Sequence, residues 1–143
     1  MNGSYSSYSI MLITPLYEAI RGNHAEAVRL LLERGACIDW KGPSDLTYLH
    51  HASLDGTVDA AKVLLDCGIE VNAKSGSESS PLHVAARNGQ YDMAKLLIDH
   101  GADVNSLDMH KNTPLDDAVE RYDYADMIDL LLAYGAIRGR YKN

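Results

Sequence analysis

The chain has 143 residues, with 13 Lys and Arg against 20 Asp and Glu, and it carries a formal net charge of -7 at pH 7. This length is typical of a single domain, and the acidic balance argues against a general affinity for nucleic acid, because phosphate binding needs a basic face. The longest apolar runs, such as residues 10–13, are far shorter than the ~18 residues that indicate a membrane span.

The predicted elements form four similar segments, each a helix, a tight turn and a second helix. The first helix of every segment begins at a hydroxyl residue, which a proline follows in three segments and Tyr48 in the second. The side-chain oxygen of such a residue caps free backbone amides, and proline suits the first helical position. The hydroxyl residues recur every 33 positions, at Thr14, Thr47, Ser80 and Thr113.

Apolar residues recur in the same register and predict how the helices pack. An alanine column lets antiparallel helices approach closely, and leucines at helical spacing supply an apolar seam. The leucine column comprises Leu16, Leu49, Leu82 and Leu115. Each second helix stops before a glycine, where a left-handed cap fits, and these glycines are Gly35, Gly68, Gly101 and Gly135.

With these columns the sequence resembles the ankyrin-repeat family. Residues 80–105, SPLHVAARNGQYDMAKLLIDHGADVN, match the family's Thr-Pro-Leu-His, Asn-Gly, Leu-Leu and Gly-Ala-Asp-Val-Asn elements, and the other segments follow with substitutions. The resemblance implies an all-α repeat solenoid, a curved stack in which β-hairpin fingers join successive helix pairs. The fingers are expected at residues 39–46, 72–79 and 105–112, which are rich in turn-forming residues.

We expect one ankyrin-repeat domain over residues 1–143, because no unit can bury its apolar face alone. The four units are expected at about residues 10–38, 39–71, 72–104 and 105–137, with terminal tails at 1–9 and 138–143. The fourth unit is the most acidic and deviates from the others, which is typical of a capping unit.

Histidines are the obvious candidates for catalysis or metal binding. His50, His51 and Asp55 form the densest cluster of titratable residues, and an enzyme or a metal-binding protein that uses this cluster is one alternative. The resemblance, however, places His50 and His83 where the family makes a structural hydrogen bond between a finger and a helix start. The sequence contains no Gly-rich phosphate loop, Ser-centred elbow or zinc-type Cys/His spacing. We therefore expect no catalytic residues, no cofactor and no metal.

The resemblance implies a partner-binding concave face, formed by the finger tips and the exposed sides of the first helices. On this face the apolar centre lies in units two and three and a negative end lies in unit four. The predicted contact residues are Trp40, Leu46, His51, Leu54, Val84, Arg87, Asp117 and Glu120. Trp40, the only tryptophan, is either an exposed anchor or a ring that packs on the neighbouring finger. The acidic run of unit four is either a solvated cap or a patch that steers a basic partner.

The predicted function is a non-catalytic protein–protein interaction module that docks an unidentified protein on its concave face, as an inhibitor or an adaptor. We expect a monomer that binds neither nucleic acid nor a membrane; a structural domain without a specific partner is the remaining alternative. Two cysteines, Cys37 and Cys67, favour a reducing cytoplasm, or a host cell's interior if the chain comes from a pathogen. By resemblance, Asn72 and Asn105 are either hydroxylation sites or make a finger-start hydrogen bond.

Overall fold

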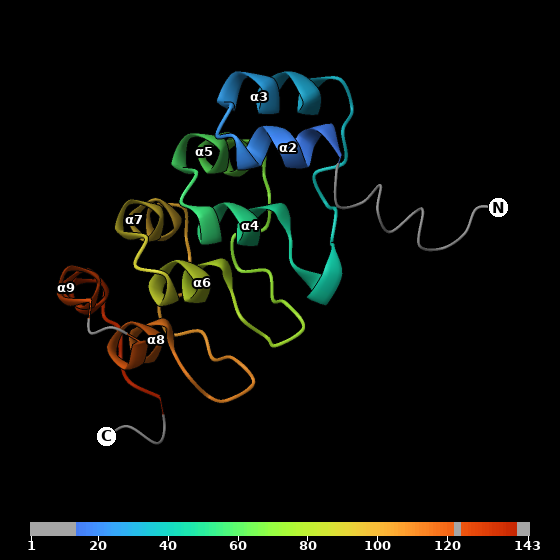
Figure 1. The fold of residues 1–143 in the computed structure, drawn as a ribbon. Coiled ribbons are helices and arrows are strands. Elements are labelled where there is room, and N and C mark those ends of the chain that lie inside the picture. The colour runs from blue at the N-terminus through green and yellow to red at the C-terminus, as the bar shows by residue number, and fades with distance from the viewer. Residues whose placement is uncertain (1–13, 122–123, 140–143) are drawn as a thin grey trace.

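The computed structural model describes residues 14–121 and 124–139, and these contain eight α-helices in four antiparallel pairs (Figure 1). The pairs are α2 (Pro15–Arg21) with α3 (Ala25–Glu33), α4 (Tyr48–Asp55) with α5 (Val58–Asp66), α6 (Pro81–Arg87) with α7 (Tyr91–Asp99), and α8 (Pro114–Arg121) with α9 (Ala125–Ala133). The four predicted helix pairs are thus confirmed. The predicted tail at 1–9, residues 10–13 of the first unit and residues 140–143 lie outside the described residues.

The helix pairs stack in two rows. The first helices α2, α4, α6 and α8 form one row, and the second helices α3, α5, α7 and α9 form the other (Figure 1). The connecting loops project from the row of first helices. No helix in the described part of the chain is long and apolar enough to cross a membrane.

The predicted hydroxyl caps start the first helices. Thr14 Oγ1 accepts a hydrogen bond of 3.0 Å from the Tyr17 N–H. Thr47, Ser80 and Thr113 each accept one of 3.3 Å from the third residue of their own helix. Each cap satisfies a backbone amide that has no partner inside the helix, so the helix start is determined locally.

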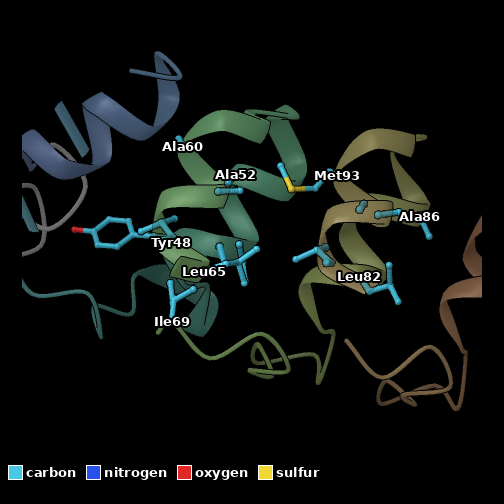
Figure 2. Close-up of a cluster of buried hydrophobic side chains, with 14 of the residues drawn as sticks. Tyr48, Ala52, Ala60, Leu65, Ile69, Leu82, Ala86 and Met93 are labelled. Atoms are coloured by element: carbon cyan, nitrogen blue, oxygen red, sulfur yellow. The ribbon is translucent and has the colours of Figure 1, made fainter. Parts of the chain in front are cut away.

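The core lies between the two rows and continues through all four units. Every residue of the leucine column is buried, and burial of one leucine side chain contributes about 2 kcal/mol to folding. Figure 2 shows the part of this core in units two and three, where Met93 reaches from α7 toward the helices of unit two. Labelled side chains from the two units are Tyr48, Ala52, Ala60, Leu65, Ile69, Leu82, Ala86 and Met93.

The fingers are present as loops, but the expected β-hairpins are not confirmed. Within the described ranges the only strand-like pairing is a single bridge between Lys41 and Thr47. Each finger is closed by one backbone hydrogen bond across a short turn: Gly42 N–H to Leu46 O, Ser75 N–H to Ser79 O, and Asp108 N–H to Asn112 O. The two sides of each finger are short and are joined by this one backbone hydrogen bond, whereas a regular strand needs several.

Adjacent fingers are tied to each other through their backbones. The Gly76 N–H donates to the Ser44 carbonyl at 2.8 Å, and the Met109 N–H donates to the Ser77 carbonyl at 3.0 Å. These bonds run from one unit to the next, so the fingers support the same stack as the helices.

Candidate partner-binding face

One cleft lies between the first helices of units two and three. His51 and Leu54 are three residues apart in α4 and share one side of the helix, and Leu46, which precedes the cap, lines the same cleft. Val84 and Arg87 occupy the positions of His51 and Leu54 one unit later. Five of the eight predicted contact residues therefore meet around a cleft of about 320 Å³, which we call the inner cleft. Its lining consists of Leu46, His50, His51, Leu54, Val84, Arg87 and Asn88.

Hydrogen bonds from two histidines join the first helices of units two and three to the fingers that follow them. His50 Nδ1 accepts from the Thr47 N–H at 3.1 Å, which leaves Nε2 to donate to the Ser79 carbonyl at 2.8 Å. His83 makes the same pair of bonds one unit later, to the Ser80 N–H and the Asn112 carbonyl. Burial lowers the pKa of both rings, although the carbonyl hydrogen bonds oppose this effect. The structural role that the resemblance implied for these histidines matches this geometry.

His51 forms the wall of the inner cleft toward unit one. Its ring packs edge-on against Tyr17, with the ring centroids 5.1 Å apart. Burial lowers the pKa of His51, and Arg21 lowers it further, while Asp55 acts in the opposite direction. His51 is therefore neutral at pH 7. Its Nε2 atom is buried without a hydrogen-bond partner in the structure as described.

Trp40 lies beside the inner cleft but does not line it. The indole stacks on Tyr48 of α4, with centroids 4.5 Å apart and planes 13° apart, and its centroid lies 5.8 Å from that of His51. The ring thus packs on the first helix of its own unit, which differs from both predicted placements. The sequence feature that indicates this contact is Tyr48, which stands where the other three units have proline. The Tyr48 hydroxyl also makes a hydrogen bond of 3.0 Å with the Thr14 hydroxyl.

Arg87 connects the inner cleft to unit four. Its Nη2 atom lies 3.1 Å from Asp117 Oδ2 and 3.3 Å from Ser79 Oγ. The side chain of Asp117 is only 9% exposed, which corrects the expectation of an exposed negative group at this position. Burial raises the pKa of Asp117 to about 6; Arg87 opposes this, and Asp108 and Glu120 add to it. Of the two predicted acidic contacts, only Glu120 is exposed.

The structure does not gather His50, His51 and Asp55 into a metal-ligand group. Among the described residues, the one such group with ligand atoms within 4.8 Å of one another is His83, Asp108 and Asp117. Each of these three side chains already has a partner inside the protein. Asp108 Oδ1, for example, accepts from the backbone N–H groups of His110 and Asn112. The group therefore stabilises the third finger against α6 and α8.

Asp116 is a buried charge that the sequence reasoning missed. It stands where His50 and His83 stand in earlier units, and its carboxylate accepts from the Thr113 N–H and, at 2.7 Å, from the Gly139 N–H. Arg138 Nε donates to it at 2.6 Å. Residues 138 and 139, which we expected in a tail, thus pack on unit four. The sequence feature that could have indicated this contact is an acidic residue at the position of His50 and His83, together with the basic residues at the end of the chain.

Asn72 and Asn105 make the finger-start hydrogen bonds that were one of their two interpretations. Asn72 Oδ1 accepts from the Asp103 N–H at 2.8 Å, and Nδ2 donates to the Gly101 carbonyl at 3.2 Å. Asn105 makes the corresponding pair of bonds to Ile137 and Gly135 in the next unit. Each amide therefore joins the first residue of its unit to the end of the same unit.

Four stacked helix pairs, with finger loops and a cleft between their first helices, define a helical-repeat solenoid. The family model described as ankyrin repeats (3 copies) matches residues 7–75 and 74–139. The chain therefore belongs to the ankyrin-repeat family. Proteins of this family are generally protein-interaction modules and typically non-catalytic. No curated protein matches the sequence.

Proposed function

We propose that this protein is a non-catalytic interaction module that docks a segment of another protein in the inner cleft. The observation that carries the proposal is that Leu46, Leu54 and Val84 converge on one cleft. Leu54 is 47% exposed there. An apolar side chain of a partner would cover this exposed surface, and the hydrophobic effect would stabilise the complex.

The proposed mechanism is docking on a largely preformed surface. The His50 bond joins α4 to Ser79, the residue before the cap of α6, and the His83 bond joins α6 to Asn112 at the end of the third finger. A cleft built on such a framework changes little when it binds, so little of the binding energy is lost in ordering the chain. The module acts as a monomer, as an inhibitor that covers a partner's surface or as an adaptor.

Trp40, Asp117 and Glu120 support this site in different ways. Trp40 positions Tyr48 and His51 at one edge of the inner cleft, and Asp117 positions Arg87 at the other. Glu120 is the exposed acidic side chain next to this second edge, and we assign it a contact at the rim. Cys37 and Cys67 are both free thiols, consistent with the reducing cytoplasm that we expect.

The test is affinity capture with the full chain and a charged substitution in the inner cleft. We expect Leu54→Asp to abolish the capture of partners, because a carboxylate at this position would have to be desolvated by the bound segment. Leu132→Asp, on α9, is the matched control, since Leu132 is 52% exposed and lies in the other row of helices.

Circular dichroism would check that both variants keep the melting temperature of the wild type. The proposal fails if Leu54→Asp captures the same partners as the wild type, or if Leu132→Asp loses the same partners as Leu54→Asp.

A further inference from the structure

The inner cleft carries a single charge of its own. At neutral pH its lining contains apolar side chains, an asparagine and two neutral histidines, because burial lowers the pKa of His50 and His51. Arg87 is the one remaining ionisable residue of the lining, and it is always protonated. The electrostatic complement of this lining is therefore an anion.

The guanidinium of Arg87 has donors to offer. Both hydrogen bonds that the structure gives Arg87 use Nη2, to Asp117 and Ser79. Nη1 and Nε make none within the described residues, and the side chain is 30% exposed. Both parallel N–H pairs of a guanidinium include Nη2, so a ligand would meet Arg87 through single N–H groups of Nη1 or Nε. Such a group donates one charge-assisted hydrogen bond to a carboxylate oxygen.

We propose that the inner cleft recognises a peptide segment that presents an apolar side chain next to a carboxylate, of the Leu-Asp or Leu-Glu kind. The apolar side chain packs against Leu46, Leu54 and Val84, and the carboxylate accepts a hydrogen bond from Arg87. This inference rests on the proposed docking in the inner cleft and adds the chemical class of the partner.

Asp117 makes this recognition sensitive to pH. A bound carboxylate is a second anion on the guanidinium that pairs with Asp117, so Asp117 is less able to keep its own charge in the complex. Asp117 is faced by His83 and Arg87 from α6, by Asp108 from the third finger and by Glu120 from α8. The two acidic neighbours favour the protonated form, and the pKa of Asp117 is about 6 before any ligand binds. Binding should therefore be accompanied by proton uptake and should strengthen as the pH falls from 7.5 to 6.

The test is a selection from phage-displayed random peptides of twelve residues, on the immobilised full chain at pH 7. We expect enrichment of peptides with Asp or Glu next to Leu, Ile or Met, and their binding should disappear with Leu54→Asp. Replacing the acid of a selected peptide by its amide should weaken binding to the wild type about tenfold, the usual effect of losing one charged hydrogen bond.

The double variant Arg87→Gln/Asp117→Asn removes both charges of the pair and leaves no buried ion without a partner. It should bind the acid and amide forms of the peptide equally well. Arg29→Gln is the matched control, because it removes one positive charge from an exposed pair with Glu26 on α3. This control should keep the tenfold preference for the acid. In the wild type the affinity should rise severalfold between pH 7.5 and 6, and in Asp117→Asn it should stay constant.

The outcomes separate this inference from the proposed function. If selected peptides depend on Leu54 but show no preference for acidic residues, the docking function stands and the carboxylate class is wrong. An acid preference that persists in the double variant also overturns the role of Arg87. If no selected peptide depends on Leu54, both proposals are wrong.

Discussion

Asp116 and Asp117 are neighbours in α8, yet their carboxyl groups differ in how strongly they hold a proton. Burial alone would raise the pKa of Asp116, but hydrogen bonds from Thr113, Arg138 and Gly139 keep it below its ordinary value. Burial does raise the pKa of Asp117, because the single guanidinium of Arg87 offsets only part of the desolvation. The number of donors around each carboxylate therefore decides which of the two has the lower pKa.

We predict that Asp117→Asn stabilises the protein more at high pH than at low pH. The folded pKa of about 6 lies above the ordinary value of 3.8, so the folded state holds an extra proton between these values. The stability that comes from this proton is lost as the pH rises through 6, and asparagine has no such dependence. Relative to the wild type, the unfolding free energy of the variant should rise by roughly 1–1.5 kcal/mol between pH 5 and pH 7.5.

Urea denaturation at the two pH values measures this difference. Asp126→Asn replaces an exposed carboxylate at the start of α9 and serves as control. An equal pH trend in the two variants would show that Asp117 does not hold an extra proton in the folded state.

At the scale of the elements, the helices could be predicted because local interactions determine them. The cap of α6 is Ser80 and the proline follows it directly, so the helix start can be read from two adjacent residues. The leucine and alanine columns then recur at helical spacing. The residues of the inner cleft could be predicted from the same 33-residue repeat, because Leu54 and Arg87 occupy equivalent positions in successive first helices.

The features that the sequence did not predict depend on contacts between distant residues. Asp117 was expected to be exposed because of its place in the register, but the Arg87 side chain of the preceding unit pairs with it. Trp40 was expected either as an exposed anchor or packed on the neighbouring finger, but its ring stacks on Tyr48, eight residues later in the chain. Asp116 was missed because its donors come from Arg138 and Gly139, more than twenty residues later in the chain.

We predict that Arg138→Gln destabilises α8 and α9. Arg138 is the only side-chain cation that the structure places on the buried carboxylate of Asp116 within the described residues. Losing a hydrogen bond to a charged, buried group costs about 2 kcal/mol. Urea denaturation should show this loss, and amide hydrogen exchange should speed up in unit four first.

Arg29→Gln breaks an ion pair whose two partners, Arg29 and Glu26, are both exposed. Pairs of this kind contribute less than ~0.5 kcal/mol, so this variant should unfold like the wild type. If the two arginine variants lose the same stability, the bond from Arg138 to Asp116 does not hold unit four in place.

At the scale of the whole molecule, the stack depends on the contacts that join each unit to the next. His50 and His83 each donate to a carbonyl of the following finger, whereas Asp116 accepts from the segment after the last unit. The folded pKa of both histidines is lowered, so the stability that they contribute is present above pH 6.5 and is lost as the pH falls below it. This trend opposes that of Asp117.

His83→Ala should uncouple unit four from the rest of the stack. The substitution removes the bond to the Asn112 carbonyl, which keeps its bond from Asp108, and leaves the buried Ser80 N–H without the His83 ring as acceptor, a loss of about 2 kcal/mol at one interface. In a linear array of units, stability is the sum of unit and interface contributions, so weakening one interface lets the units on either side unfold separately. Trp40 is the only tryptophan and lies in the first described finger, so its fluorescence reports on the N-terminal half of the stack.

In the wild type we expect urea transitions followed by tryptophan fluorescence and by far-ultraviolet circular dichroism to coincide. In His83→Ala the dichroism signal, which reports all helices, should begin to fall at a lower urea concentration than the fluorescence signal. His24→Ala is the control, because His24 is exposed and its side chain does not cap α3. Coincident transitions in His83→Ala would mean that packing between the helices, without the histidine bond, is enough to keep the four units cooperative.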